Sequence, residues 1–205
     1  MAEPNTPISS KVIADILHSV AINHVITIDL HSAQTQGFFD MTIENITLES
    51  QFAAYIEKHY KKDSFAIASP DAGGVKRARK IADLVHCNDV IIIDKNRYVK
   101  NKSKVMNIIG DPKDKNIIII DDMIDTAGTI CHAAAALKEK GANHVSVMAT
   151  HPVFSGNAYE NLSKEDIDKI IVTNTLTVKP ELTKVDFIDI SEILAKNIYQ
   201  IFSHK

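Results

Sequence analysis

The residues best suited to chemistry follow the most apolar segment of the chain. In "IIIIDDMIDTAGT", residues 117–129, four isoleucines lead directly into Asp121 and Asp122, and Asp125 opens a turn of small residues. Carboxylates at the end of a buried strand lose hydration and repel one another, which costs free energy unless a ligand compensates. Because sugar hydroxyls and Mg²⁺ are suitable partners for such oxygens, the stretch predicts a polar ligand site.

The turn "DTAGT" adds the groups that phosphate needs. Ala127 and Gly128 let the backbone come close to a ligand, Thr126 and Thr129 add hydroxyl donors, and a helix start presents backbone N–H groups. A sugar phosphate would satisfy both the turn and the acids. The alternative is an ordinary strand-turn-helix with Asp125 as the helix cap. The two further acids beside it favour the ligand site.

A second strand-turn-helix pattern, "SPDAGGVKRAR", spans residues 69–79. The backbone amides of Gly73 and Gly74 could donate hydrogen bonds to an anion, while Asp71 could serve as a metal ligand. Three basic residues follow on the helix: Lys76, Arg77 and Arg79. Arg79 fits a solvated helix face, whereas for Lys76 and Arg77 a solvated face and a place in the site stay equally open.

Residues 29–40, "DLHSAQTQGFFD", place His31 after a predicted strand end. A lone histidine at such a position is usually structural. Paired with Asp71 across the sheet, His31 would instead complete an open magnesium or manganese site.

A basic run, "DKNRYVKNKSKV", spans residues 94–105 and also leaves a strand end. Such a run is usually a solvated loop. Lys95 and Arg97 lie closest to the strand, so they could neutralise charge that builds on a transferring phosphoryl group.

These motifs need a scaffold that gathers strand ends, and the rest of the sequence predicts one. Short β-branched runs are expected as strands at 24–30, 64–69, 90–94, 116–121, 144–150, 169–175 and 185–190. Helical patterns are expected at 9–21, 73–85, 127–141 and 191–202. This alternation predicts an α/β fold with a parallel sheet covered by helices on both faces. Ligands of such folds bind beyond the carboxyl ends of the strands.

Composition narrows the class of partner. The chain has 205 residues, 45% of them hydrophobic, and a net charge of -3, which favours a small anionic ligand in a local site over nucleic acid. Two cysteines without metal or disulfide spacing indicate a reducing compartment. We expect a cytoplasmic protein, because neither a signal peptide nor an apolar run long enough for a membrane span is found.

The motifs together resemble a known family. "IIIIDDMIDTAGT" is similar to the phosphoribosyl-binding loop of type I phosphoribosyltransferase folds. The stretches "DLHSAQTQGFFD", "SPDAGGVKRAR", "IIIDKNR", "IIIIDDMIDTAGT" and "ATHPVFSGNA" occur in the order expected of ribose-phosphate pyrophosphokinases. The resemblance implies transfer of the diphosphoryl group of MgATP to ribose 5-phosphate, giving 5-phosphoribosyl 1-diphosphate and AMP.

Residue roles follow from the resemblance. Asp121 and residues 125–129 would hold ribose 5-phosphate, with Arg97 assisting, and Lys95 and Arg97 would stabilise the transition state. His31 and Asp71 would be Mg²⁺ ligands. The family's enzymes generally assemble into hexamers, so a homo-oligomer is expected.

The chain also differs from the family in the position of one motif. The "DLH" motif of the family follows most of an N-terminal domain, so residues 1–45 would be the remnant of that domain and residues 46–205 the C-terminal domain. The residues that bind adenine in the family are not found here. A separate N-terminal chain or self-association could cover the exposed sheet edge. A noncatalytic, ribose 5-phosphate-binding subunit is therefore the alternative to an enzyme, and a base phosphoribosyltransferase is a third, which the "SPDAGG" and "DLH" motifs disfavour.

Overall fold

The computed structural model describes residues 8–95, 106–164 and 166–203, and the chain divides into two compact units, 1–48 and 49–205. Each unit has its own sheet, of two strands in the first unit and seven in the second. Within the described residues, no helix combines the length and the apolar character needed to cross a bilayer.

The first unit is a small parallel pair of strands with two helical segments. Its elements in chain order are α1 (Ser9–Ser19), β1 (His24–Ile28), the 3₁₀ helix η1 (Ala33–Phe38) and β2 (Thr42–Ile46). Strands β1 and β2 pair in parallel from His24 opposite Thr42 to Ile28 opposite Ile46. The side chain of Asn45 accepts the Leu30 N–H at 3.0 Å and so ties the end of β1 to its neighbour.

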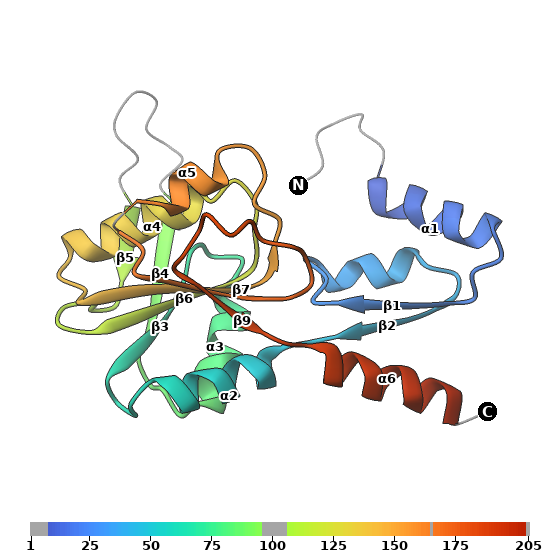
Figure 1. The fold of residues 1–205 in the computed structure, drawn as a ribbon, viewed down its shortest axis with the longest axis horizontal. Coiled ribbons are helices and arrows are strands. Elements are labelled where there is room, and N and C mark those ends of the chain that lie inside the picture. The colour runs from blue at the N-terminus through green and yellow to red at the C-terminus, as the bar shows by residue number, and fades with distance from the viewer. Residues whose placement is uncertain (1–7, 96–105, 165, 204–205) are drawn as a thin grey trace. The chain divides into compact units, whose positions relative to one another are not determined.

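The second unit contains the remaining strands and helices (Figure 1). They are, in chain order, α2 (Glu49–His59), β3 (Phe65–Ser69), α3 (Val75–Leu84), β4 (Val90–Lys95), β5 (Met106–Ile109), β6 (Asn116–Ile124), α4 (Gly128–Glu139), β7 (His144–Pro152), α5 (Ala158–Leu162), β8 (Lys169–Thr173), β9 (Val185–Ile188) and α6 (Ser191–Ser203).

The seven strands lie in the order β5-β4-β3-β6-β7-β8-β9, and every neighbouring pair is parallel except β4 with β5. Helices α4 and α5 lie on one face of this sheet and α2 and α3 on the other (Figure 1). The predicted α/β class, with a mostly parallel sheet covered on both faces, is therefore confirmed. The antiparallel edge strand β5 is an addition that the sequence pattern did not predict.

Burial on both faces explains the long apolar strands. Ile117 and Ile119 of β6 pack in the same core cluster as Leu137 of α4, whereas Ile118 and Ile120 are equally inaccessible but outside that cluster. Since successive strand residues point to opposite faces, a strand that is covered twice must be apolar at every position.

The chain reverses direction across the sheet between β3 and β6. From β3 it moves outward to β4 and β5, and it then returns to place β6 on the other side of β3. Such a switch point opens a crevice beyond the carboxyl ends of the two strands, where α/β proteins bind ligands. The loops that follow β3 and β6 carry the second and first motifs of the sequence.

Candidate functional site

The acidic pair lies within the last part of β6 rather than after it. We expected this strand to end at Asp121, but its pairing with β7 continues to Ile124, which lies opposite Pro152. The strand is longer because β7 also extends, to Pro152, and supplies hydrogen-bonding partners. Asp121 is half-buried, and Asp122 is buried with 5% of its surface exposed.

Asp122 has a cationic partner on helix α3, whereas the contact described for Asp121 is with the backbone. Arg77 of α3 places Nη1 3.4 Å from Asp122 Oδ1, so Arg77 faces the site and not only solvent. Asp121 Oδ1 accepts the backbone N–H of Asp122 at 2.9 Å. Burial first, then contact with Asp122 and the charge of Asp71, raise the pKa of Asp121 to about 7.

The loop after β3 lies near Asp121, since the charge of Asp71 in that loop contributes to the raised pKa of Asp121. Asp71 Oδ1 accepts the N–H of Gly74 at 3.0 Å, and Ser69 Oγ donates to the Asp71 carbonyl at 2.7 Å. The expectation that Gly74 offers a free amide to an anion is therefore wrong in this conformation. A side chain at Gly74 would also approach Ser69 Oγ to 2.8 Å, so a larger residue would displace that hydroxyl.

The turn after β6 has the form of a phosphate-binding loop. Helix α4 begins at Gly128, and the preceding Ala127 is the N-cap in a left-handed conformation, φ 61°. No side chain caps this helix, so the alternative role of Asp125 as a cap is wrong. The first-turn N–H groups of a helix have no intrahelical acceptor, and together with the helix dipole they favour an anion. A side chain at Gly128 would meet only Thr126 Oγ1, at 4.0 Å, so space is open above the turn.

The opposite side of this loop is held by the segment that follows β7. Ser155 Oγ donates to the carboxylate of Asp125, and Asn161 Nδ2 donates to the Thr126 carbonyl at 3.0 Å. The backbone N–H of Phe154 donates to the Ile124 carbonyl at 2.9 Å. Sequence reasoning found the motif "ATHPVFSGNA" only by resemblance and assigned no role to Ser155 or Asn161, since nothing in their local pattern indicates a contact about thirty residues away.

The structure does not test the roles predicted for three of the site residues. Arg97 lies outside the described residues, and of Lys95 only the backbone, the last residue of β4, is described. His31 is an exposed residue of the first unit, between β1 and η1. Its predicted pairing with Asp71 stays a prediction.

The donor set fits Mg²⁺ and a sugar phosphate. Among the described residues, no three His, Cys, Asp or Glu side chains are grouped as a metal-binding cluster. Mg²⁺, however, commonly keeps several waters and takes only one or two carboxylates together with substrate phosphates. Asp121, with a pKa raised to about 7 by burial and neighbouring acids, is a carboxyl group that a cation or hydroxyl donors would stabilise in its ionised form.

Comparison with known proteins shows the family of this chain. Residues 66–205 match the family described as phosphoribosyl synthetase-associated domain. The chain belongs to this phosphoribosyl synthetase-associated family. The matched range contains the whole second motif (residues 69–79), the acidic pair, the loop after β6 and the segment after β7. The resemblance inferred from these motifs is thereby confirmed.

Relatives of the phosphoribosyl synthetase-associated chain carry the name ribose-phosphate pyrophosphokinase. Those from Wolinella succinogenes and Campylobacter jejuni subsp. jejuni are each 44% identical over 100% of this chain. The crystal structure of phosphoribosylpyrophosphate synthetase from Mycobacterium smegmatis is 33% identical, with a TM-score of 0.89 over 98% of this chain and 66% of that one. The chain spans about 65% of the length of the two bacterial relatives.

Proposed function

We propose that this protein acts in the ribose-phosphate diphosphokinase reaction. MgATP would donate its terminal diphosphoryl group to ribose 5-phosphate, and the products would be 5-phosphoribosyl 1-diphosphate and AMP, for nucleotide biosynthesis. One observation carries the proposal: a loop with the form of a phosphate site adjoins an acidic pair at the switch point of the sheet. The names of its relatives support the same reading.

Ribose 5-phosphate would bind along the loop after β6. The backbone N–H groups of residues 126–129, at the start of α4, would donate hydrogen bonds to the 5-phosphate. The carboxylates of Asp121 and Asp125 would accept hydrogen bonds from ribose hydroxyls. These two sets of groups follow one another along the chain, at the end of β6 and in the turn after it, so a phosphorylated pentose could contact both.

The transfer itself needs positioning and charge neutralisation more than a protein nucleophile. The anomeric hydroxyl oxygen would form a bond to the β-phosphorus of ATP and lose its proton to water, as the bond between the β-phosphorus and the α-phosphate oxygen breaks and AMP leaves with that oxygen. Lys95 and Arg97 would stabilise the charge on the transferred group, and Arg97 would also contact the sugar phosphate. His31 and Asp71 would hold Mg²⁺, which when bound neutralises phosphate charge.

An apolar face of helix α1 is exposed and would be covered by a partner. Helix α1 buries only Ala14 and leaves Val12, Ile13 and Ile16 about half exposed. Exposed apolar faces of this kind are typical of interaction surfaces. We infer a homo-oligomer, or a separate N-terminal chain, as the partner that covers this face.

The test combines binding with turnover. Calorimetry with ribose 5-phosphate and with ATP, each with Mg²⁺, is followed by measurement of AMP formation when both are present. Saturable binding of both substrates and AMP formation that requires ribose 5-phosphate are expected. Binding of ribose 5-phosphate without ATP binding or AMP formation would contradict catalysis by this chain and select the noncatalytic subunit. Pyrophosphate release that depends on a nucleobase would contradict the reaction class.

A further inference from the structure

Residues 154–161, here called the brace, contact the phosphate-binding loop at three successive residues. Phe154 N–H donates to the Ile124 carbonyl at 2.9 Å, and Ser155 N–H donates to the Asp125 carbonyl at 3.2 Å. Ser155 Oγ donates to the Asp125 carboxylate, and Asn161 Nδ2 donates to the carbonyl of residue 126 at 3.0 Å. Both backbone and side chains of the brace are therefore fitted to the loop.

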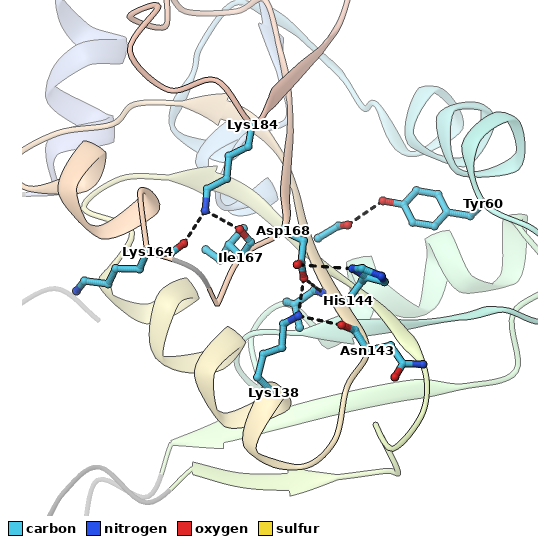
Figure 2. Close-up of polar contacts among 10 residues, drawn as sticks. Tyr60, Lys138, Asn143, His144, Lys164, Ile167, Asp168 and Lys184 are labelled. Atoms are coloured by element: carbon cyan, nitrogen blue, oxygen red, sulfur yellow. Dashed lines mark hydrogen bonds and ion pairs between the residues drawn. The ribbon is translucent and has the colours of Figure 1, made fainter.

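The amide of Asn161 is fixed in one orientation. Its Oδ1 accepts Lys164 Nζ at 3.1 Å, which leaves Nδ2 as the group directed at the loop. The turn that carries Lys164 is itself fixed by Lys184, whose Nζ donates to the carbonyls of Lys164 and Ile167 at 2.6 Å each (Figure 2). A chain of contacts thus runs from the end of the sheet to the loop.

The loop and the brace are also strained in a matching way. Ala127 and Phe154 adopt left-handed φ values of 61° and 46°, which L-residues avoid and which a bulky residue rarely adopts. Such conformations persist only where their surroundings determine them. The ring of Phe154 packs edge-on against Tyr159 with centroids 5.5 Å apart, and Tyr159 Oη accepts the Lys179 N–H at 3.0 Å.

We infer that Ser155 and Asn161 are positioning residues that pre-form the ribose 5-phosphate loop. The inference rests on the proposed function, since it names the ligand of that site. Ser155 fixes the carboxylate of Asp125, which is to meet a ribose hydroxyl. Asn161 fixes the backbone at Thr126, where the amides that are to bind phosphate begin. A loop held in its binding conformation before the ligand arrives avoids the entropy cost of ordering it.

The two residues predict different binding defects. Ser155→Ala should weaken ribose 5-phosphate binding about fivefold and inorganic phosphate binding less, because it acts through Asp125, and Ser155→Thr should restore affinity. Asn161→Asp keeps the shape but turns an acceptor toward the carbonyl of Thr126, so binding of both ligands should weaken about tenfold.

Matched controls separate positioning from general effects. Asn157→Asp adds the same charge in the same segment, at a side chain that makes no capping hydrogen bond, and should change affinity less than about twofold. Ser163→Ala removes a hydroxyl that donates to the helix carbonyl of Tyr159, and it should leave affinity unchanged.

Amide hydrogen exchange gives a readout that needs no ligand. The N–H groups of Phe154, Ser155 and Cys131 donate to the carbonyls of Ile124, Asp125 and Ala127. Their exchange should accelerate in Ser155→Ala and Asn161→Asp but not in the controls, while strands β6 and β7 keep their protection. Wild-type exchange at these amides, unchanged affinity, or a loss of protection across the whole sheet would each overturn the positioning role. Failure of the wild-type chain to bind ribose 5-phosphate would overturn the proposed function, and the exchange data would still decide whether the brace holds the loop.

Discussion

Carboxylates lie at both ends of the strands in the seven-stranded sheet. Asp168 directly precedes β8, and Asp121 lies near the carboxyl end of β6. Asp168 Oδ2 accepts Lys138 Nζ and the Val145 N–H, each at 2.7 Å, and Oδ1 lies 3.6 Å from His144 Nδ1 (Figure 2). Burial alone would raise the pKa of Asp168, but these donors outweigh it and lower the pKa. For Asp121, burial and neighbouring acids together raise the pKa to about 7.

The difference separates an acid whose ionised form the fold stabilises from one whose ionised form it destabilises, and we propose the second as the ligand-binding residue. Lys138, which donates to Asp168, comes from the chain's own helix α4 and also donates to the Asn143 carbonyl at 2.9 Å (Figure 2). At Asp121 the neighbouring charges that shift the pKa are those of Asp122 and Asp71, which are both acidic. Folding thus stabilises the ionised form of the first acid and destabilises that of the second, so only the second gains from binding a cation or hydroxyl donors.

Removal of Asp168, at the amino end of β8, should have the largest effect on stability. Asp168→Ala leaves the Val145 N–H without its acceptor and Lys138 without its carboxylate partner, and we expect a loss of about 2 to 3 kcal/mol in the free energy of unfolding. Urea denaturation measures it. Asp168→Asn keeps one acceptor oxygen and should lose less. If Asp168→Ala unfolds at the wild-type urea concentration, the structural role of this acid is wrong.

A site carboxylate should show the reverse profile. Asp125→Ala should weaken ribose 5-phosphate binding by about 1 to 3 kcal/mol, the worth of a charge-assisted hydrogen bond. Its stability should change little, because Asp125 is exposed and water can replace it as the partner of Ser155. Calorimetry on Asp125→Ala and on Asp168→Ala, in buffer where both are folded, makes the comparison. Equal affinities of the two variants for ribose 5-phosphate would contradict the division into a structural acid and a binding acid.

The raised pKa of Asp121 gives a pH-dependent test. Because the folded pKa of about 7 exceeds the unfolded value near 3.8, the folded state holds this proton more tightly, and stability falls as pH rises between these values. Asp121→Asn, which stays neutral and can still accept the Asp122 N–H, should therefore be more stable than the wild type above pH 7, by about 1 to 2 kcal/mol. The advantage should shrink as pH falls toward 4. Urea denaturation at pH 5 and pH 8 measures it, and an advantage that is equal at both values would contradict the assignment.

The fold was predictable where burial on both faces leaves a continuous apolar run. Strands β3, β4, β6 and β7 and helices α3, α4 and α6 fall within or close to the expected ranges. Strand β5 was missed because its four residues gain strand geometry from pairing with β4, and Ile109 is exposed. Strand β2 was missed because Glu44 and Asn45 interrupt its apolar pattern.

The site was predictable as a set of motifs but not as a set of contacts. Spacing and residue type located Asp121, Asp71 and the phosphate loop. Whether Arg77 faces solvent or the site was left open, and its pairing with Asp122 was not predicted, since a helix surface looks the same in sequence whether it faces solvent or a loop. The bonds from Ser155 and Asn161 depend on how two loops meet after the sheet has formed, and no local pattern encodes that.

The smallest effect is expected at Ala127, where opposing terms nearly cancel. Its left-handed conformation costs about 1 kcal/mol or more, which glycine would recover. Glycine would also increase the entropy of the unfolded chain, at a cost of about 0.5 to 1 kcal/mol. It would remove the methyl group of a residue that is only 4% exposed, and burial of that group is worth up to about 0.8 kcal/mol. Ala127→Gly should therefore change the free energy of unfolding by less than about 1 kcal/mol, in contrast to Asp168→Ala, when both are measured by urea denaturation. A loss as large as that of Asp168→Ala would mean that the alanine methyl group, and not the hydrogen bonds from the brace, holds the loop in its binding conformation.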